Sequence, residues 1–104
     1  MSDYIVAKTF DTITFVENDL KYKEFEECTF INCDFRTCTF QNESFVDCNF
    51  IGCNFQSTKI NYVSLRDVLF TKCNFTSVNF AMTDQILYHF NFQECILDYA
   101  QFYK

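Results

Sequence analysis

The sequence predicts a repeat protein built from five-residue units, rather than a helical bundle or a hairpin-rich sheet. Every fifth position from 10 to 80 is Phe, Leu or Ile. This period matches neither the 3.6 residues of a helical turn nor the two-residue alternation of a flat strand. The chain has one Gly and no Pro, so the usual hairpin turns lack the residues that form them. Each unit must therefore place one residue inward and then turn.

The apolar centres of these units continue along nearly the whole chain. They are Phe10, Phe15, Leu20, Phe25, Phe30, Phe35, Phe40, Phe45, Phe50, Phe55, Ile60, Leu65, Phe70, Phe75 and Phe80. The pattern then slips by two residues and resumes at Leu87, Phe92, Leu97 and Phe102. We expect this slip, over residues 81–85, to form a bulge. We also expect a single domain over residues 1–104, with regular repeats over 8–80 and again over 85–104.

The stretch CTFINCDFRTCTF poses a choice between a metal site, a disulfide framework and core packing. All seven cysteines lie two residues before a centre: Cys28, Cys33, Cys38, Cys48, Cys53, Cys73 and Cys95. Compact apolar residues such as Val63 and Val78 take this slot elsewhere, and reduced cysteine behaves as a small hydrophobe. A straight column of thiols cannot converge on one zinc ion, and an odd number fits poorly with disulfides. The pattern favours core packing, with no metal and no cofactor.

The segments CDFRTCTF, CNFIGCNF and CNFTSVNF resemble the pentapeptide-repeat family, and the resemblance covers about residues 8–103. It implies an all-β fold, a right-handed quadrilateral parallel β-helix (solenoid) with four pentapeptides in each coil. Nineteen centres then give about 4.75 coils. Their inward side chains stack in four columns, with Phe30, Phe35, Phe40, Phe50, Phe55 and Phe75 among the structural core centres.

The last coil is incomplete in this sequence, and solenoids need their ends covered. Two explanations stay open: a homodimer formed by end-to-end or edge contact, or a longer repeat protein of which this chain is part. The N-terminus has no secretory leader pattern and no window is apolar enough to span a membrane. We therefore expect a cytoplasmic protein.

The net charge of −6 comes entirely from the first half, where residues 1–50 hold ten acidic and four basic side chains. Direct nucleic-acid binding is not expected, because phosphate contacts need a basic surface. The columns place Glu27, Asp47 and Asp67 on successive coils, with Glu24 and Glu26 beside them. These residues form a candidate acidic interaction surface, and an ordinary solvated face is the alternative.

Two other polar features stand out. Lys23 and Glu43 occupy the same inward column one coil apart, so we expect them to pair, because a buried unpaired charge is costly. The alternative is that both side chains turn outward at an irregular side. His89 is the only histidine and has no convincing nucleophile or base with it, so no catalytic residue and no enzyme activity are expected.

Two functions remain. The first is a rigid scaffold for an unknown protein partner, presenting columns such as Ile31 and Ile51 or Tyr22 and Tyr62. The second follows from resemblance to the phenylalanine- and cysteine-rich family members. These mimic DNA, bind DNA gyrase or another type II topoisomerase, and modulate it or protect it from quinolones.

Overall fold

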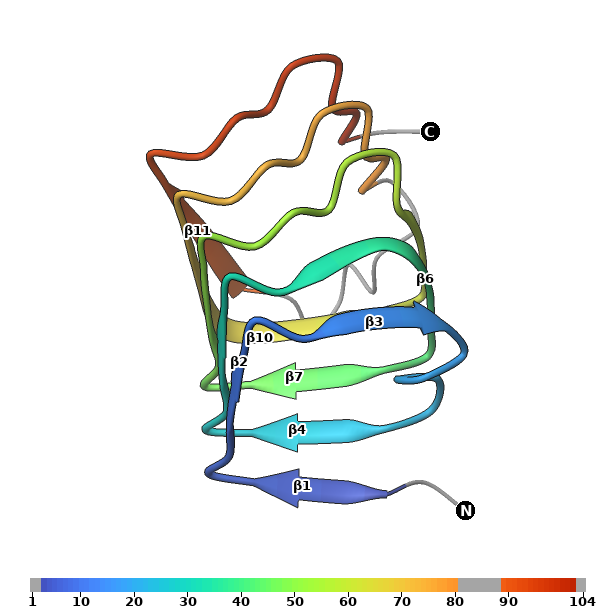
Figure 1. The fold of residues 1–104 in the computed structure, drawn as a ribbon, viewed down its shortest axis with the longest axis vertical. Coiled ribbons are helices and arrows are strands. Elements are labelled where there is room, and N and C mark those ends of the chain that lie inside the picture. The colour runs from blue at the N-terminus through green and yellow to red at the C-terminus, as the bar shows by residue number, and fades with distance from the viewer. Residues whose placement is uncertain (1–2, 81–88, 103–104) are drawn as a thin grey trace.

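The computed structural model describes residues 3–80 and 89–102, without the side chains of residues 59 and 61. Within this range the chain forms strands and turns and contains no helix. The strands are β1 Tyr4–Val6, β2 Thr9–Asp11, β3 Thr14–Glu17, β4 Glu24–Glu26, β5 Thr29–Ile31, β6 Asp34–Gln41, β7 Ser44–Val46, β8 Asn49–Ile51, β9 Lys59–Asn61, β10 Ser64–Thr71 and β11 His89–Gln93. All strand pairings are parallel, and they join each coil to the next. The fold is the right-handed quadrilateral parallel β-helix that the sequence predicts, with about four turns (Figure 1).

Four sides repeat along the solenoid. Side one stacks β2, β5, β8, the second half of β10, and β11. Side two stacks β3 on the first half of β6 and continues through single bridges at Asn54 and Asn74. Side three pairs the second half of β6 with β9, and side four stacks β1, β4, β7 and the first half of β10. Figure 1 shows the strands of side four lying one above another.

The aromatic centres stack through the interior of these coils. On side one the ring centroids of Phe30 and Phe50 lie 4.6 Å apart, and those of Phe50 and Phe70 lie 5.0 Å apart. On side two, Phe35 and Phe55 stack at 4.7 Å. Rings of neighbouring sides meet edge to face, as Phe50 and Phe55 do at 5.6 Å. Both arrangements suit the aromatic quadrupole, and the stacking distance is close to the strand spacing of about 4.8 Å.

The slot two residues before a centre is most often filled by cysteine, whose thiol donates to the backbone. Six of the seven cysteines are buried, Cys95 is half-buried, and all seven are free thiols. The Cys53 thiol donates to the Phe30 carbonyl of the preceding coil at 3.3 Å. The Thr58 hydroxyl does the same to Phe35 at 2.9 Å. The slot therefore admits a compact side chain, and a carbonyl of the preceding coil can accept a hydrogen bond from it. A threonine can replace cysteine there because its hydroxyl makes the same bond.

The corners use left-handed backbone instead of glycine. Fifteen described non-glycine residues have φ between 46° and 64°, each two positions after a centre, and Gly52 has φ 65°. Such a conformation costs a non-glycine residue roughly 1–2 kcal/mol. Hydrogen bonds between coils offset this cost; for example, Thr12 N–H donates to Ile31 O at 2.8 Å and Asn32 N–H to Ile51 O at 2.8 Å. The side chains of Asp34, Asn54 and Asn74 also accept backbone hydrogen bonds two residues ahead.

Two departures from regular structure concern the first coil and the slip. In the first coil the β3–β6 register shifts between Thr14 and Val16, and a tight turn follows over residues 18–22. The predicted bulge at 81–85 lies outside the described residues. The pairings around it show the required change: Phe50 pairs with Phe70, twenty residues later, whereas Phe70 pairs with Phe92, twenty-two later.

The predicted pairing of Lys23 with Glu43 was wrong. Glu43 is buried, but neither of its carboxyl oxygens has a hydrogen-bond partner, and no ion pair joins it to Lys23. Lys23 is only partly buried and lines a hollow at the N-terminal end of the solenoid. The shared column fixed where the two side chains start but not where they point.

Candidate interaction surface

Three of the predicted acidic residues occupy equivalent corner positions on successive coils. Glu27, Asp47 and Asp67 each follow side four, are exposed, and have φ of 55°, 53° and 54°. The Glu27 N–H donates to Val46 O at 2.9 Å, and the Asp47 N–H donates to Arg66 O at 3.0 Å. The ladder thus fixes the backbone positions of these three corners relative to one another. We call these three residues, together with Glu24 and Glu26 on β4, the acidic corner.

The two glutamates of β4 extend the acidic corner toward the N-terminal coil. Glu24 is exposed, while Glu26 is half-buried and accepts a hydrogen bond from the Tyr4 hydroxyl on β1. This bond raises the pKa of Tyr4, since the nearby carboxylate disfavours a phenolate. Glu26 is therefore already engaged by its own chain.

The C-terminal end of the acidic corner lies beside a histidine to which the sequence assigned no role. His89 Nδ1 lies 3.0 Å from Asp67 Oδ1, and both side chains are largely exposed. The contact comes from the irregular pairing of β10 with β11, where the register shifts between Arg66 and Val68. Counting twenty-two residues across the slip, instead of twenty, places His89 beside Asp67. That count was the signal available in the sequence.

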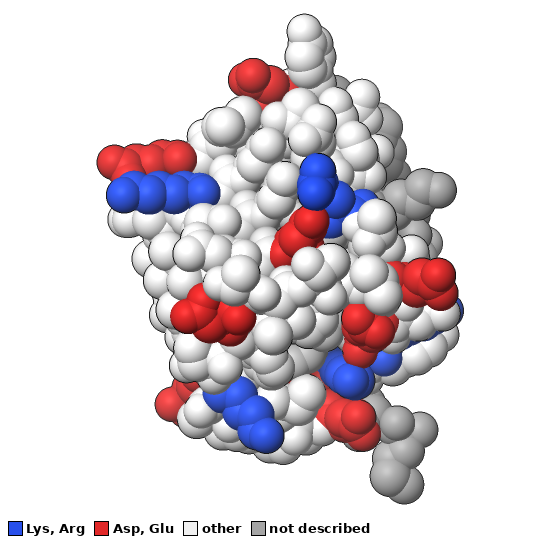
Figure 2. Space-filling view, in the orientation of Figure 1, with Lys and Arg blue, Asp and Glu red and all other residues white. Residues whose placement is uncertain are grey.

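Basic side chains interrupt the acidic ones elsewhere on the surface. Figure 2 shows one face on which red and blue groups lie side by side instead of forming a patch of one sign. An example is the ion pair of Asp34 and Arg36 at 2.9 Å, in which the guanidinium lowers the pKa of Asp34. Lys72 and Glu94 make a looser contact at 3.9 Å. The stacked order of the acidic corner, and not overall charge alone, distinguishes it.

The apolar and aromatic columns provide a second, smaller set of exposed groups. Ile51 is 38% exposed, whereas Ile31 below it is half-buried. Tyr22 and Tyr62 are 50% and 58% exposed, and they lie two coils apart with Asn42 between them. These side chains do not form one continuous apolar patch.

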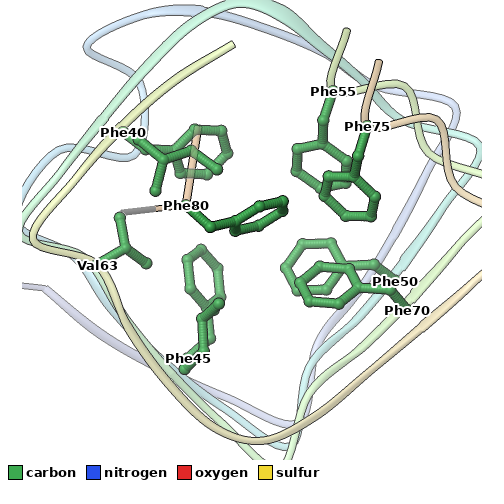
Figure 3. Close-up of a pocket in the computed structure, with 10 residues that line it drawn as sticks. Phe40, Phe45, Phe50, Phe55, Val63, Phe70, Phe75 and Phe80 are labelled. Carbon is green, nitrogen blue, oxygen red and sulfur yellow. The ribbon is translucent and has the colours of Figure 1, made fainter. Parts of the chain in front are cut away.

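The hollow among the stacked rings of the described residues is too small for a substrate or cofactor. The enclosed hollow among the stacked rings has a volume of about 20 Å³, and Figure 3 shows that phenylalanines fill its walls. Ligand pockets are usually about 300–1,000 Å³. In the described part of the chain, no group of three or more His, Cys, Asp or Glu side chains could hold a metal ion. No helix long and apolar enough to cross a membrane occurs among the described residues.

Comparison with known proteins places this architecture in a family. A profile of the pentapeptide repeat region matches residues 23–102. The chain belongs to the pentapeptide-repeat family. A search of curated proteins found no match to this pentapeptide-repeat protein.

Two solved structures are among those that match this chain, and the first of them shares its fold. One is full-length QnrB1, a plasmid-mediated fluoroquinolone resistance protein, with a TM-score of 0.69 and 18% sequence identity. The match covers 88% of this chain but only 43% of QnrB1, so this chain spans less than half the length of that protein. The other is the pentapeptide repeat protein Rfr23 from the cyanobacterium Cyanothece 51142, with a TM-score of 0.37 and 9% identity, covering 95% of this chain and 83% of that one.

Proposed function

We propose that this pentapeptide-repeat protein is a non-enzymatic, rigid scaffold that contacts a protein partner through its acidic corner. One observation carries the proposal: three exposed carboxylates occupy equivalent corner positions on successive coils. Like charges at this spacing are mildly destabilising to the sheet. A basic partner surface would offset that repulsion, and the rigid ladder would present the carboxylates at little entropic cost on binding.

Charge reversal with affinity capture tests this proposal. The triple variant Glu27→Lys, Asp47→Lys and Asp67→Lys should keep its fold, because Lys72 already occupies a corner with φ 56°. The matched control reverses three exposed acids away from side four, namely Asp11, Glu17 and Asp98. We expect the wild-type chain and the control to retain a common protein that the triple variant loses. Retention of the same proteins by all three chains would contradict the proposal.

A type II topoisomerase such as DNA gyrase is the alternative partner. It is favoured by the resemblance to the phenylalanine- and cysteine-rich family members and by the fold shared with QnrB1, described as a fluoroquinolone resistance protein. A supercoiling assay, with and without a quinolone, across a titration of this chain tests the alternative. Inhibition, or rescue from the drug, that is lost in the triple variant would support gyrase as the partner. If the chain changes neither supercoiling nor its inhibition by the drug at any concentration, gyrase is excluded and the partner is a different protein.

The exposed Ile51, Tyr22 and Tyr62 side chains supply a separate contact surface to compare in the same capture experiment. If Ile51→Lys or the double variant Tyr22→Ala and Tyr62→Ala loses the partner while the acidic-corner variant keeps it, the scaffold function stands but its surface is apolar.

A further inference from the structure

Glu43 is an acidic residue in a slot where the repeat places small or apolar side chains. It lies just before β7, in the same inward column as Lys23 and Val63. Its side chain is 1% exposed, and neither carboxyl oxygen has a hydrogen-bond partner. Within the described residues it is the one buried side chain left in this condition. The fold therefore encloses a carboxyl group whose charge its surroundings compensate only in part.

The charged form of this group is unfavourable in the closed structure. Desolvation raises the pKa of Glu43 to about 7, and the backbone at Gln41 and Glu43 and the charge of Lys21 oppose this shift only in part. The neutral acid is the form that fits below neutral pH. Above neutral pH the buried group is a carboxylate, and any rearrangement that lets water reach it is favoured.

The part of the molecule best able to rearrange is the turn over residues 18–23, which we call the first-coil turn. In the described structure, coils pack against it from one direction only (Figure 1). A hollow of about 270 Å³ opens beside it, lined by Ile5, Phe10, Ile13, Phe15, Asp19, Leu20, Lys23 and Phe25. The Tyr22 N–H reaches Gln41 O at 3.4 Å, whereas the equivalent bond from Glu27 to Val46 is 2.9 Å. The Tyr22 end of the first-coil turn is thus held less tightly to the next coil than the following corner is. The Lys23 end accepts one bond across the coils, from Ser44 N–H at 3.0 Å.

We propose that ionisation of Glu43 releases the first-coil turn from the second coil. In the open form water reaches the carboxylate, and the positive charges of Lys21 and Lys23 are free to approach it. The N-terminal edge of the solenoid is then closed at acidic pH and open at alkaline pH. This response does not depend on the identity of the protein partner.

We attribute the pH response to ionisation of Glu43 itself, and the neighbouring groups are as follows. The first-coil turn contributes Asp19, Lys21 and Lys23, and β6 contributes the thiol of Cys38. Burial raises the pKa of Cys38 to about 12, so this thiol stays neutral over the range concerned. The column neighbour on the other side, Val63, is uncharged.

The sign of the effect follows from proton linkage. The closed form binds the proton with a pKa of about 7, and the open form with the ordinary value of 4.5. The closed form therefore loses stability relative to the open form as pH rises between these values, and the loss levels off above 7. Between pH 6 and pH 8 the closed-to-open ratio should fall about tenfold.

Hydrogen exchange measured by NMR at pH 6 and pH 8 tests the proposal. The readouts are the protection factors of the Tyr22 amide, which bonds Gln41 O, and of the Ser44 amide, which bonds Lys23 O at 3.0 Å, corrected for the intrinsic pH dependence of exchange. We expect about a tenfold fall in the wild-type chain from the linkage above, and no fall in Glu43→Gln, which keeps the shape of the side chain but cannot ionise. The control Glu17→Gln removes an exposed carboxylate from the coil that contains the first-coil turn, and it should behave as wild type.

Three results would overturn the proposal. The first is an unchanged protection factor at Tyr22 and Ser44 in the wild-type chain. The second is the same fall in Glu43→Gln. The third is an equal fall at Phe75, whose N–H bonds Ile96 O at 2.8 Å in the distant coils, because this would indicate global unfolding instead of local opening.

Discussion

Truncation of Phe50 to alanine should destabilise the solenoid severely, because this ring lies at the centre of the aromatic core. Its side chain is 1% exposed and stacks between Phe30 at 4.6 Å and Phe70 at 5.0 Å. It also meets Phe45 at 5.2 Å and Phe55 at 5.6 Å, edge to face. Buried Phe→Ala changes cost about 3–5 kcal/mol, and the strand ladders above and below limit collapse into the cavity. We therefore expect a loss of about 4–5 kcal/mol in the free energy of unfolding.

Phe10 provides a matched comparison in the same column. It stacks on one side only, with Phe30 at 4.9 Å, and it is half-buried beside the N-terminal hollow. Because its removal gives up about half the transfer free energy of a fully buried ring, Phe10→Ala should cost about 1–1.5 kcal/mol. The loss for Phe50→Ala should therefore be about three to four times the loss for Phe10→Ala. This ratio reflects the stacking of Phe50 between two rings, where Phe10 stacks on one.

Urea unfolding followed by far-ultraviolet circular dichroism at pH 6 measures both losses. If Phe50→Ala does not fold, the milder pair Phe50→Leu and Phe10→Leu should show the same order. Equal losses at the two positions, or a larger loss at Phe10, would refute the reasoning that central rings gain stability from neighbours on both sides.

Three further experiments have expected outcomes. Glu43→Gln should raise the free energy of unfolding by up to about 3 kcal/mol at pH 8 and leave it unchanged at pH 4, because burial raises the pKa of Glu43 from 4.5 to about 7. Urea titrations at both values check this, and an equal gain at each pH would contradict it. A thiol reagent such as DTNB should label the half-buried Cys95 rapidly and the buried cysteines only after unfolding; a fast phase that survives in Cys95→Ser would be the contrary result. Gly52→Ala should cost about 1–2 kcal/mol, because φ is 65° and the new Cβ would lie 2.4 Å from Asn32 Oδ1. Adding Asn32→Ala should restore part of the loss in thermal unfolding, and no restoration would argue against that contact.

The sequence predicted the columns because a strict five-residue period determines which side chains point inward. Phe10, Phe30, Phe50, Phe70 and Phe92 form one column in the structure, as the count across the slip requires. This inference needs only the period and the direction of the side chain. It does not require the conformation of any corner to be known.

Features that depend on side-chain rotamers or on the register between coils could not be predicted from the five-residue period. Glu43 and Lys23 share a column but their side chains diverge, since the first coil has its own tight turn. The contact between His89 and Asp67 depends on an irregular pairing next to the slip. β6 runs straight through Thr37, where other coils turn with positive φ, and nothing in the local residue pattern marks that difference.

The most direct test of the acidic corner as a protein contact is site-specific photo-cross-linking. A photoreactive phenylalanine analogue replaces Val46, which precedes Asp47 at the corner, or Gln56, which is exposed on side two. Each chain is irradiated in a lysate, and covalent adducts are identified by mass spectrometry. The account predicts a defined protein adduct from position 46 and none of that protein from position 56. The same adduct from both positions, or from position 56 alone, would contradict it.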